Sequence, residues 1–179
     1  MAKIKKAAVI GAGVMGAGIA AHITNAGIPV VLLDIVSKDA KKRNAIAEDA
    51  VVKMLKTGPA PFMSNRNASM ITTGNIEDNL DLLSDCDWIV EAIIERLDLK
   101  QDLYKKIEST RKKGSVVSSN TSTIPLKELT GGMPASMVPD FVITHFFNPP
   151  RYMRLLEVVA SDKTRADAVD IIRTFGDVQ

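Results

Sequence analysis

Three glycines near the start of the chain have the spacing of a dinucleotide-binding turn, G-x-G-x-x-G. They follow the apolar run 7–10 and precede a stretch rich in alanine and isoleucine. In such a turn the first glycine permits a sharp bend, the second lets a pyrophosphate approach the backbone, and the third lets the helix pack on the strand. A glycine-rich turn without a ligand is the alternative, but its position between strand and helix favours a dinucleotide site. The residues expected to contact the cofactor are Gly11, Ala12, Gly13, Val14, Met15 and Gly16.

An acidic residue, Asp34, ends the second apolar run, 30–33. In a dinucleotide-binding fold, an acid at this position hydrogen-bonds the adenosine ribose hydroxyls and repels a 2′-phosphate. No arginine follows it immediately, so the sequence predicts NAD rather than NADP. The alternative is a solvated loop acid with no ligand.

A histidine and a glutamate form the second candidate constellation. His145 follows the apolar segment 141–144, and Glu157 lies inside the apolar segment 155–159. A carboxylate among apolar neighbours is costly to bury without a partner, and contact with His145 would remove that cost. The pair would also orient the imidazole and stabilise its cation, as a general base requires. An unrelated core histidine and an edge-strand glutamate remain the alternative, and His22, in the first helix, is interpreted as structural.

Polar residues also follow two other expected strands. The cluster 118–123 offers hydroxyl and amide groups, and its Asn120 and Ser122 are candidates to bind cofactor and substrate oxygens. Glu95 lies just beyond the strand that ends at Ala92. A capped turn and a helix N-terminal acid are the respective alternatives. Two distant histidines and one cysteine, Cys86, have no metal-ligand spacing, so no metal is expected.

The elements that must position these residues alternate between strands and helices. We expect strands at 7–10, 30–33, 70–73, 88–92, 115–119, 141–144 and 155–159. Helices are expected at 14–25, from Ser37 or Asp39 to Lys56, along the stripe Leu99, Leu103 and Ile107, and at 163–175. Lys100, Lys105 and Lys106 fall off that stripe. Residues 58–69 are expected to form a surface loop. The alternation predicts an α/β fold, a doubly wound Rossmann-type sheet that is mostly parallel, with helices on both faces.

Composition narrows the class of protein. The 179 residues, 46% apolar and 25% charged, suit one globular domain. A net charge of +2 argues against nucleic-acid binding, and no apolar run is long enough to span a membrane. The single cysteine permits no intramolecular disulfide, which favours a reducing, cytoplasmic compartment. The start of the chain lacks the apolar region of a signal peptide.

With these residues in place, the chain resembles the NAD-binding (N-terminal) domain of L-3-hydroxyacyl-CoA dehydrogenases. The resemblance covers essentially the whole chain. Four separate motifs occur in the order and with the spacing found in this family, and this combination is far more specific than the glycine turn alone. The motifs are Gly11–Gly18 (GAGVMGAG), Val90–Glu95 (VEAIIE), Ser119–Thr123 (SNTST) and His145–Pro149 (HFFNP) followed by Leu155-Leu156-Glu157.

The resemblance implies a role for each matching residue. Asp34 would hold the adenosine ribose, His145 would be the catalytic base, and Glu157 would be its partner. Ser122 would also touch the substrate hydroxyl. The reaction would be oxidation of a 3-hydroxyacyl-CoA to a 3-oxoacyl-CoA in fatty-acid β-oxidation. The further positions that match NAD contacts of the family are Glu95, Lys100, Ser122 and Asn148.

One departure limits what the resemblance implies. Family members continue into a helical C-terminal domain that closes the cleft, and we expect residues 1–179 to lack it, so that the chain binds NAD but turns over poorly. A full-length form would be a homodimer or part of a multifunctional β-oxidation protein. Lys53 and Lys56 are candidates for CoA contact by location and charge. The competing hypotheses are a non-catalytic NAD-binding module and another β-hydroxyacid dehydrogenase, whose catalytic lysine would come from a later domain.

Overall fold

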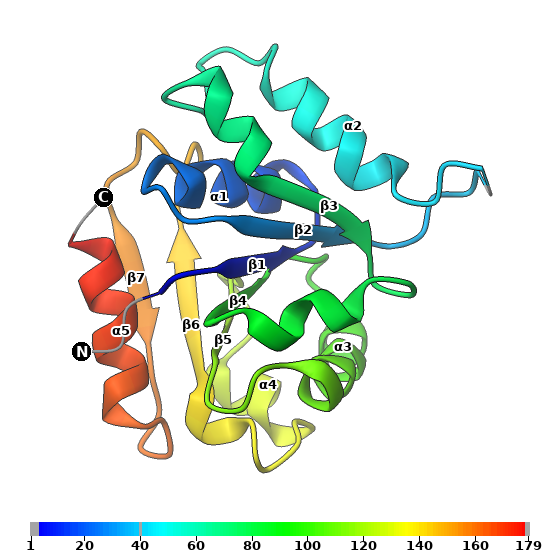
Figure 1. Cartoon of the computed structure of the whole chain (residues 1–179). Helices are drawn as coiled ribbons and strands as arrows, with labels where there is room; N and C mark the ends of the chain where they lie inside the picture. The colour runs from blue at the N-terminus through cyan, green and yellow to red at the C-terminus, as the bar shows by residue number, and fades with distance from the viewer. Residues whose placement is uncertain (1–3, 40, 178–179) are drawn as a thin grey trace.

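The computed structural model describes residues 4–39 and 41–177, and these residues form one mixed sheet with helices on both faces (Figure 1). The strands are β1 (Ala7–Ile10), β2 (Val30–Asp34), β3 (Ile71–Asn75), β4 (Trp88–Glu91), β5 (Val116–Ser119), β6 (Phe141–Phe146) and β7 (Leu156–Val159). Their order across the sheet is β3-β2-β1-β4-β5-β6-β7. The first six are parallel, and β7 pairs antiparallel with β6. The predicted Rossmann-type fold is therefore confirmed.

Two layers of helices cover the sheet. The α-helices are α1 (Val14–Asn25), α2 (Ala45–Met54), α3 (Leu97–Thr110), α4 (Leu126–Gly131) and α5 (Ala166–Gly176). One face packs against α1, α2 and α5, and the other packs against α3 and α4. Neighbouring strand residues alternate between these two cores: Val9 faces the first and Ile10 the second, as the period of two along a strand requires.

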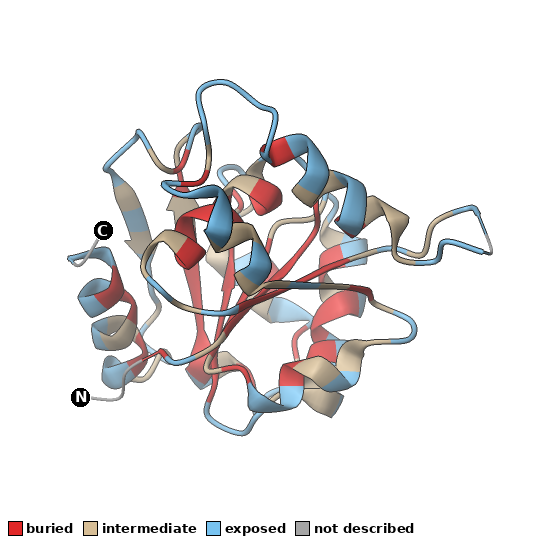
Figure 2. Ribbon diagram, turned by 45° about the horizontal axis from the view of Figure 1, so that its top comes forward, coloured by how far each residue is buried: buried red, intermediate tan, exposed pale blue. Residues whose placement is uncertain are grey.

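The central strands are buried on both faces (Figure 2). Every residue of β1, β4 and β5 is buried, which explains why these strands are mostly continuous apolar runs in the sequence. The edge strand β7 instead alternates between exposed and half-buried residues. The central strands are thus shielded from solvent, whereas the edge strand β7 is partly exposed.

The sheet contains a topological switch point next to its first strand. β1 lies between β2 and β4, so the chain leaves β1 toward one edge and later returns to its other side. In open parallel sheets, ligands bind at the carboxyl ends of the strands beside such a point. The loops after β1, β4, β5 and β6 all meet at this edge, which is where the sequence placed its candidate residues.

Helix α2 begins later than predicted. The sequence placed its start at Ser37 or Asp39, but the helix begins at Ala45, and residue 40 lies outside the described residues. The Ser37 hydroxyl accepts a hydrogen bond from the Asp39 N–H, and the Asp39 carboxylate accepts one from the Lys41 N–H. Such local side-chain contacts stabilise turns at the expense of a helix.

Several connections carry structure that the sequence did not predict. Three 3₁₀ helices, at Asn65–Met70, Leu80–Asp85 and Val138–Asp140, occupy segments expected to be loop or strand. Helix α4 was also missed, because it is short and follows a proline-containing turn. The last helix begins at Ala166 rather than near Lys163, since the Ser161 and Thr164 side chains hold a turn there.

The buried face of α3 differs from the predicted stripe. Leu99 is 38% exposed, whereas Lys100 is 1% exposed and lies on the buried face with Leu103, Tyr104 and Ile107. The spacing of apolar residues predicts which face of a helix is buried, but it does not detect a buried lysine. Lys100 was therefore predicted to lie outside the buried face, although a carboxylate partner allows it to be buried there.

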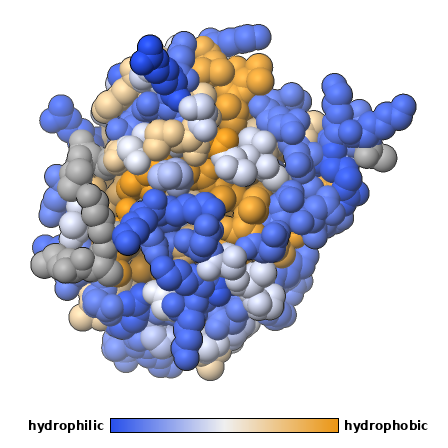
Figure 3. Space-filling model, in the orientation of Figure 1, coloured by the Kyte–Doolittle hydropathy of each residue, from blue (hydrophilic) through white to orange (hydrophobic). Residues whose placement is uncertain are grey.

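Hydrophobic residues also reach the surface. On the face shown in Figure 3 they form a central band with hydrophilic residues around it. Among the helices of the described ranges, none is both long and apolar enough to cross a membrane.

Candidate active site

The glycine turn after β1 is shaped by close backbone contacts. Gly11 has a φ of +107°, and a Cβ added there would lie 2.5 Å from the Ala92 carbonyl oxygen. A Cβ on Gly16 would lie 1.8 Å from the Gly11 carbonyl oxygen, so α1 packs directly on the turn. Both glycines are therefore required by the fold itself.

Gly13 is different, because a Cβ added there would meet nothing within 4 Å. It is the N-cap of α1, and no side chain caps that helix end. The turn therefore leaves open space at the positive end of a helix dipole, which is where a pyrophosphate binds in this fold. This geometry fits the dinucleotide predicted from the sequence.

Asp34 lies at the end of β2, beside the glycine turn. Its carboxylate accepts hydrogen bonds from the Ala12 N–H at 2.5 Å and from the Ile35 N–H at 2.6 Å. The acid therefore holds the turn against β2 and lies where the sequence predicted a ribose contact.

The His145–Glu157 pair forms across the antiparallel junction of β6 and β7. The two residues are direct partners in the strand register, and His145 Nδ1 lies 2.8 Å from Glu157 Oε2. Because an ionised carboxylate only accepts hydrogen bonds, Nδ1 donates its hydrogen and Nε2 is left as the basic nitrogen. The predicted contact is therefore present, although His145 lies within β6 rather than after it.

Glu157 is not buried, contrary to what its apolar neighbours in the sequence predict. Its side chain is 53% exposed, and that of His145 is 21% exposed. β7 is an edge strand, so alternate residues face away from the core even though the sequence around Glu157 is apolar. The glutamate thus pairs with His145 through strand register, without any need to neutralise a buried charge.

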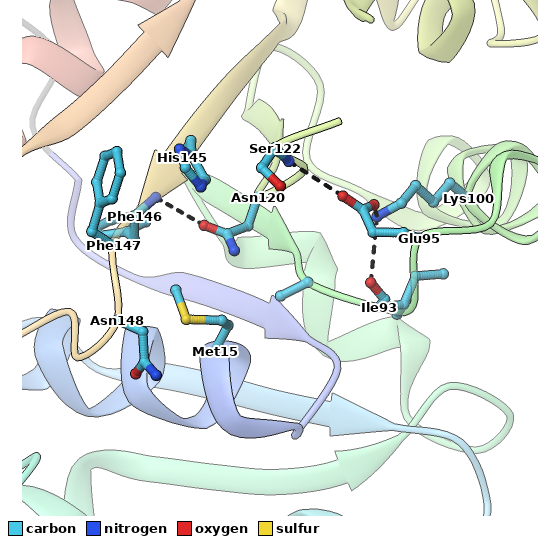
Figure 4. A pocket seen from close by; sticks show the side chains of 11 residues that line it. Met15, Ile93, Glu95, Lys100, Asn120, Ser122, His145, Phe146, Phe147 and Asn148 are labelled. Carbon is cyan, nitrogen blue, oxygen red and sulfur yellow. Dashed lines mark hydrogen bonds and ion pairs between the residues drawn. The ribbon is translucent and has the colours of Figure 1, made fainter. Parts of the chain in front are cut away.

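One cavity of about 360 Å³ gathers half of the predicted residues (Figure 4). In the close-up, Met15 from α1 and Asn148 lie on one side, Glu95 and Lys100 on another, and His145, Asn120 and Ser122 close the remaining side. The residues that line it are Met15, Ala92, Ile93, Glu95, Lys100, Asn120, Ser122, His145, Phe146, Phe147 and Asn148.

A second cavity of about 520 Å³ shares Asn148 with the first. It lies between the start of α1, the end of α2 and the segment 148–151, and Lys53 lines it. Ala12, Gly13 and Val14 line this cavity, while Gly11, Gly16, Asp34 and Glu157 line neither and support the residues that do.

Hydrogen bonds fix the loops around the first cavity. The Asn120 side chain accepts a hydrogen bond from the Phe146 N–H at 2.9 Å, which ties the loop after β5 to β6. Glu95 accepts from the Thr121 hydroxyl at 2.7 Å and from the Ser122 N–H at 3.2 Å. Burial alone would raise the pKa of Glu95, but these bonds and the Lys100 ammonium outweigh it and hold that pKa below its usual value. Glu95 is therefore a carboxylate at neutral pH.

Sequence reasoning missed one residue close to the cavity, Glu91. It is 0% exposed at the end of β4, and Lys100 Nζ lies 2.6 Å from its Oε1. The signal that could have found it is a carboxylate in the apolar run 88–92, the same signal that was applied to Glu157.

His22, interpreted as structural from the sequence, and Cys86 both lie in the interior. His22 is buried in α1 beside the Phe146 ring, at 6.3 Å between ring centroids. Burial, together with the charge of Arg151, lowers its pKa. Cys86 is also buried, which raises the pKa of its thiol to about 12 and makes it unreactive.

This fold and the glycine turn at this edge are those of a dinucleotide-binding domain. Comparison with known families narrows the class. Residues 6–178 match the family described as 3-hydroxyacyl-CoA dehydrogenase, NAD binding domain, and the chain belongs to that family. NAD is the cofactor of the domain, in agreement with the sequence prediction.

Individual relatives agree with this family. A protein of Deinococcus radiodurans named as a 3-hydroxyacyl-CoA dehydrogenase is 53% identical over 175 residues, which cover 98% of this chain and 51% of the relative. A protein of Rickettsia felis named as a fatty acid oxidation complex trifunctional enzyme is 44% identical over 173 residues, covering 97% of this chain and 24% of that protein. The chain thus spans about half the length of the first relative and about a quarter of the second.

A solved structure supports the fold at lower identity. The 3-hydroxybutyryl-CoA dehydrogenase of Escherichia coli K12 is 26% identical, with a TM-score of 0.79 over 99% of this chain and 37% of that chain. Other relatives that match this chain are named as a subunit of a fatty acid oxidation complex or as a multifunctional protein of fatty acid beta-oxidation.

Proposed function

We propose that this domain carries the cofactor site and the catalytic base of an enzyme that oxidises 3-hydroxyacyl-CoA to 3-oxoacyl-CoA in fatty-acid β-oxidation. The observation that carries the proposal is the His145–Glu157 pair at 2.8 Å, with His145 lining the same cavity as Met15 of α1 and Ser122. A base, hydroxyl-binding groups and a dinucleotide turn at one sheet edge suit the oxidation of an alcohol.

His145 and Glu157 divide the proton chemistry. Nε2 of His145 takes the proton of the substrate 3-hydroxyl, and Glu157 stabilises the imidazolium that results. Ser122 donates a hydrogen bond that positions the substrate oxygen. NAD, when bound, would supply the redox chemistry as the acceptor of the hydride that leaves C3.

The cofactor would be held along the switch point of the sheet. The glycine turn and the start of α1 would bind the pyrophosphate, and Asp34 would accept hydrogen bonds from the adenosine ribose. The residues proposed to contact the nicotinamide half are Glu95, Lys100, Asn120, Ser122 and Asn148.

The part of the second cavity between the end of α2 and the segment 148–151 is proposed to receive the CoA portion of the substrate, while its wall at Ala12, Gly13 and Val14 is left to the cofactor pyrophosphate. The second cavity shares Asn148 with the first cavity, so a ligand bound there could extend toward His145. Lys53 supplies a positive charge suited to a CoA phosphate, whereas Lys56, the other candidate, does not line this cavity. Lys53 is therefore the better of the two candidates.

A kinetic comparison tests the proposal. In the longer protein that contains this domain, His145→Ala should abolish turnover of 3-hydroxybutyryl-CoA and of a long-chain homologue, because the base is lost. Calorimetric titration should give nearly unchanged NAD affinity, since NAD would keep its other contacts. If His145→Ala lost both turnover and NAD affinity, this result would show that His145 has a structural role and is not the base. NAD binding by the unsubstituted protein without any turnover would favour a non-catalytic NAD-binding module.

The 179-residue chain alone is proposed to bind NAD but to turn over little substrate. Support comes from relatives about twice as long, whose remaining residues would complete the substrate site. A normal rate of NADH production from a 3-hydroxyacyl-CoA by this chain would refute this. We also propose that the longer protein is a homodimer or part of a multifunctional protein, and that it works in the cytoplasm, as the unpaired Cys86 favours.

A further inference from the structure

A buried carboxylate lies directly behind the first cavity. Glu91 is 0% exposed and does not line the cavity, yet its two oxygens accept four hydrogen bonds. Oε1 accepts from Lys100 Nζ at 2.6 Å and from the Ile93 N–H at 2.8 Å. Oε2 accepts from the Ser119 hydroxyl at 2.6 Å and from the Tyr104 hydroxyl at 2.8 Å. One side chain therefore joins β4, the loop after it, α3 and β5.

Lys100 forms a buried ion pair with this carboxylate. Its side chain is 1% exposed, and its ammonium lies 2.6 Å from Glu91, 3.1 Å from Glu95 and 3.4 Å from the Ile93 carbonyl oxygen. Tyr104 adds no negative charge, because burial and the neighbouring Glu91 raise the pKa of its hydroxyl. A buried ammonium that loses its closest counter-ion gives up its proton more readily. Among the carboxylates that Lys100 contacts, Glu91 is the closer counter-ion.

The contacts continue from Lys100 to the cavity wall. Lys100 holds one oxygen of Glu95, and the other oxygen of Glu95 holds Thr121 and the Ser122 N–H. Figure 4 shows Lys100, Glu95 and Ser122 one after another around the cavity. A change at Glu91 would therefore affect the position of Ser122 through two ionic contacts and one hydrogen bond.

We infer that Glu91 is a positioning residue of the cofactor site: it holds the Lys100 ammonium in place, and through Lys100 it fixes Glu95 and the loop that carries Ser122. The inference rests on the proposed function, which assigns NAD contacts to Glu95, Lys100 and Ser122. It adds a residue outside the cavity and the mechanism by which it acts.

Glu91→Gln tests the inference, because glutamine keeps the shape of the side chain but removes its charge. NAD affinity of the 179-residue chain is titrated calorimetrically between about pH 7.5 and about pH 9.5, where ordinary carboxyl and imidazole groups do not titrate. The unsubstituted chain should show constant affinity. Glu91→Gln should bind about tenfold more weakly at the lower pH, equivalent to about 1.4 kcal/mol, and should weaken further as Lys100 loses its proton.

Two further variants separate positioning from a general loss of stability. Ser118→Ala is the matched control, because Ser118 neighbours Ser119 in β5 and is equally buried but bonds Trp88 and Thr144 instead. It should leave NAD affinity unchanged. The double variant Glu91→Gln/Lys100→Met has no buried ammonium, so its weakened affinity should be independent of pH. If Glu91→Gln does not fold, Tyr104→Phe and Ser119→Ala each remove one bond to Glu91 and should give smaller shifts of the same kind.

Three results would overturn the inference: unchanged affinity with a flat pH profile in folded Glu91→Gln, an equal loss in Ser118→Ala, or a pH-dependent double variant. Failure of the proposed function gives a different pattern. If Glu95→Gln and Ser122→Ala bind NAD as tightly as the unsubstituted chain, the proposed cofactor contacts are wrong. If those two weaken binding and Glu91→Gln does not, only the role of Glu91 is wrong.

Discussion

Two glutamates with apolar neighbours in the sequence, Glu91 and Glu157, lie in opposite environments. Glu91 is fully buried in a central strand, where an unpaired charge would be prohibitive, and it has four hydrogen-bond donors. Glu157 is half exposed on the edge strand and meets His145 because the two face each other across the ladder. At the scale of single residues, the position of the strand in the sheet decides whether a carboxylate is buried and which groups it contacts. The neighbouring residues in the sequence do not decide this.

Glu157 is half exposed, so its substitution should have little effect on stability. It pairs with His145, so the same substitution should lower turnover. Glu157→Gln should change the free energy of unfolding by less than about 0.5 kcal/mol, as for most surface substitutions. In the longer protein it should lower kcat by about 100-fold, because the imidazolium loses its negative partner. Denaturant unfolding and steady-state kinetics measure the two effects. A large loss of stability with little change in kcat would show that the glutamate is structural.

Asp34 is expected to set the choice between NAD and NADP. Asp34→Asn should weaken NAD binding by about tenfold and narrow the NAD-to-NADP affinity ratio, because the charge that repels a 2′-phosphate is gone. Calorimetric titration with both cofactors measures the ratio. Asp39→Asn, in the exposed segment before α2, is the control and should change neither affinity. An NAD-to-NADP ratio that does not move in Asp34→Asn would contradict the assignment.

At the scale of elements, the glycine turn separates folding from binding. Gly11 and Gly16 are required because β1, α1 and the loop after β4 approach one another within contact distance. Gly13 has open space above it and is required only if something binds there. One motif therefore contains positions under two different physical constraints, which its spacing in the sequence does not distinguish.

This difference predicts opposite outcomes for two alanine substitutions. Gly13→Ala should leave the thermal midpoint nearly unchanged and weaken NAD binding, because the methyl group would meet the pyrophosphate and not the protein. Gly16→Ala should lower the thermal midpoint strongly, since its methyl group would overlap the Gly11 carbonyl. Thermal unfolding and NAD titration on both variants test this. Unaltered NAD affinity in Gly13→Ala would argue against the dinucleotide turn.

At the scale of the whole molecule, the stability of the domain should depend on pH through His22. Burial lowers its pKa below the ordinary value of 6.5, so the folded state keeps it neutral while the unfolded chain takes up a proton. The associated stability is complete above about pH 6.5 and is lost as the pH falls toward the lowered value. Denaturant unfolding between about pH 7 and about pH 5 should show a decline that His22→Leu reduces. The variant His145→Gln is the control and should retain the decline, and an unchanged decline in His22→Leu would assign it to other groups.

Most of the architecture was predictable because the central strands carry strong local signals. β1, β2 and β4 are apolar runs followed by a glycine turn or an acid, and α1 begins and ends as predicted. Signals were weaker where short polar side chains compete for the backbone. The start of α2 after Ser37 and Asp39, and the turn before α5, were placed too early for that reason.

The sequence by itself determined the dinucleotide turn, the acid at the end of β2 and the gathering of Glu95, Ser122 and His145 at one edge. These follow from local order along the chain, since the carboxyl ends of parallel strands meet at the same edge of a sheet. Only the tertiary structure decided which charges are buried. Lys100 and Glu91 form a buried ion pair, whereas Glu157 is half exposed. The physical reason is that desolvation depends on what packs against a side chain from other elements, and residue order along a single strand or helix does not contain that information.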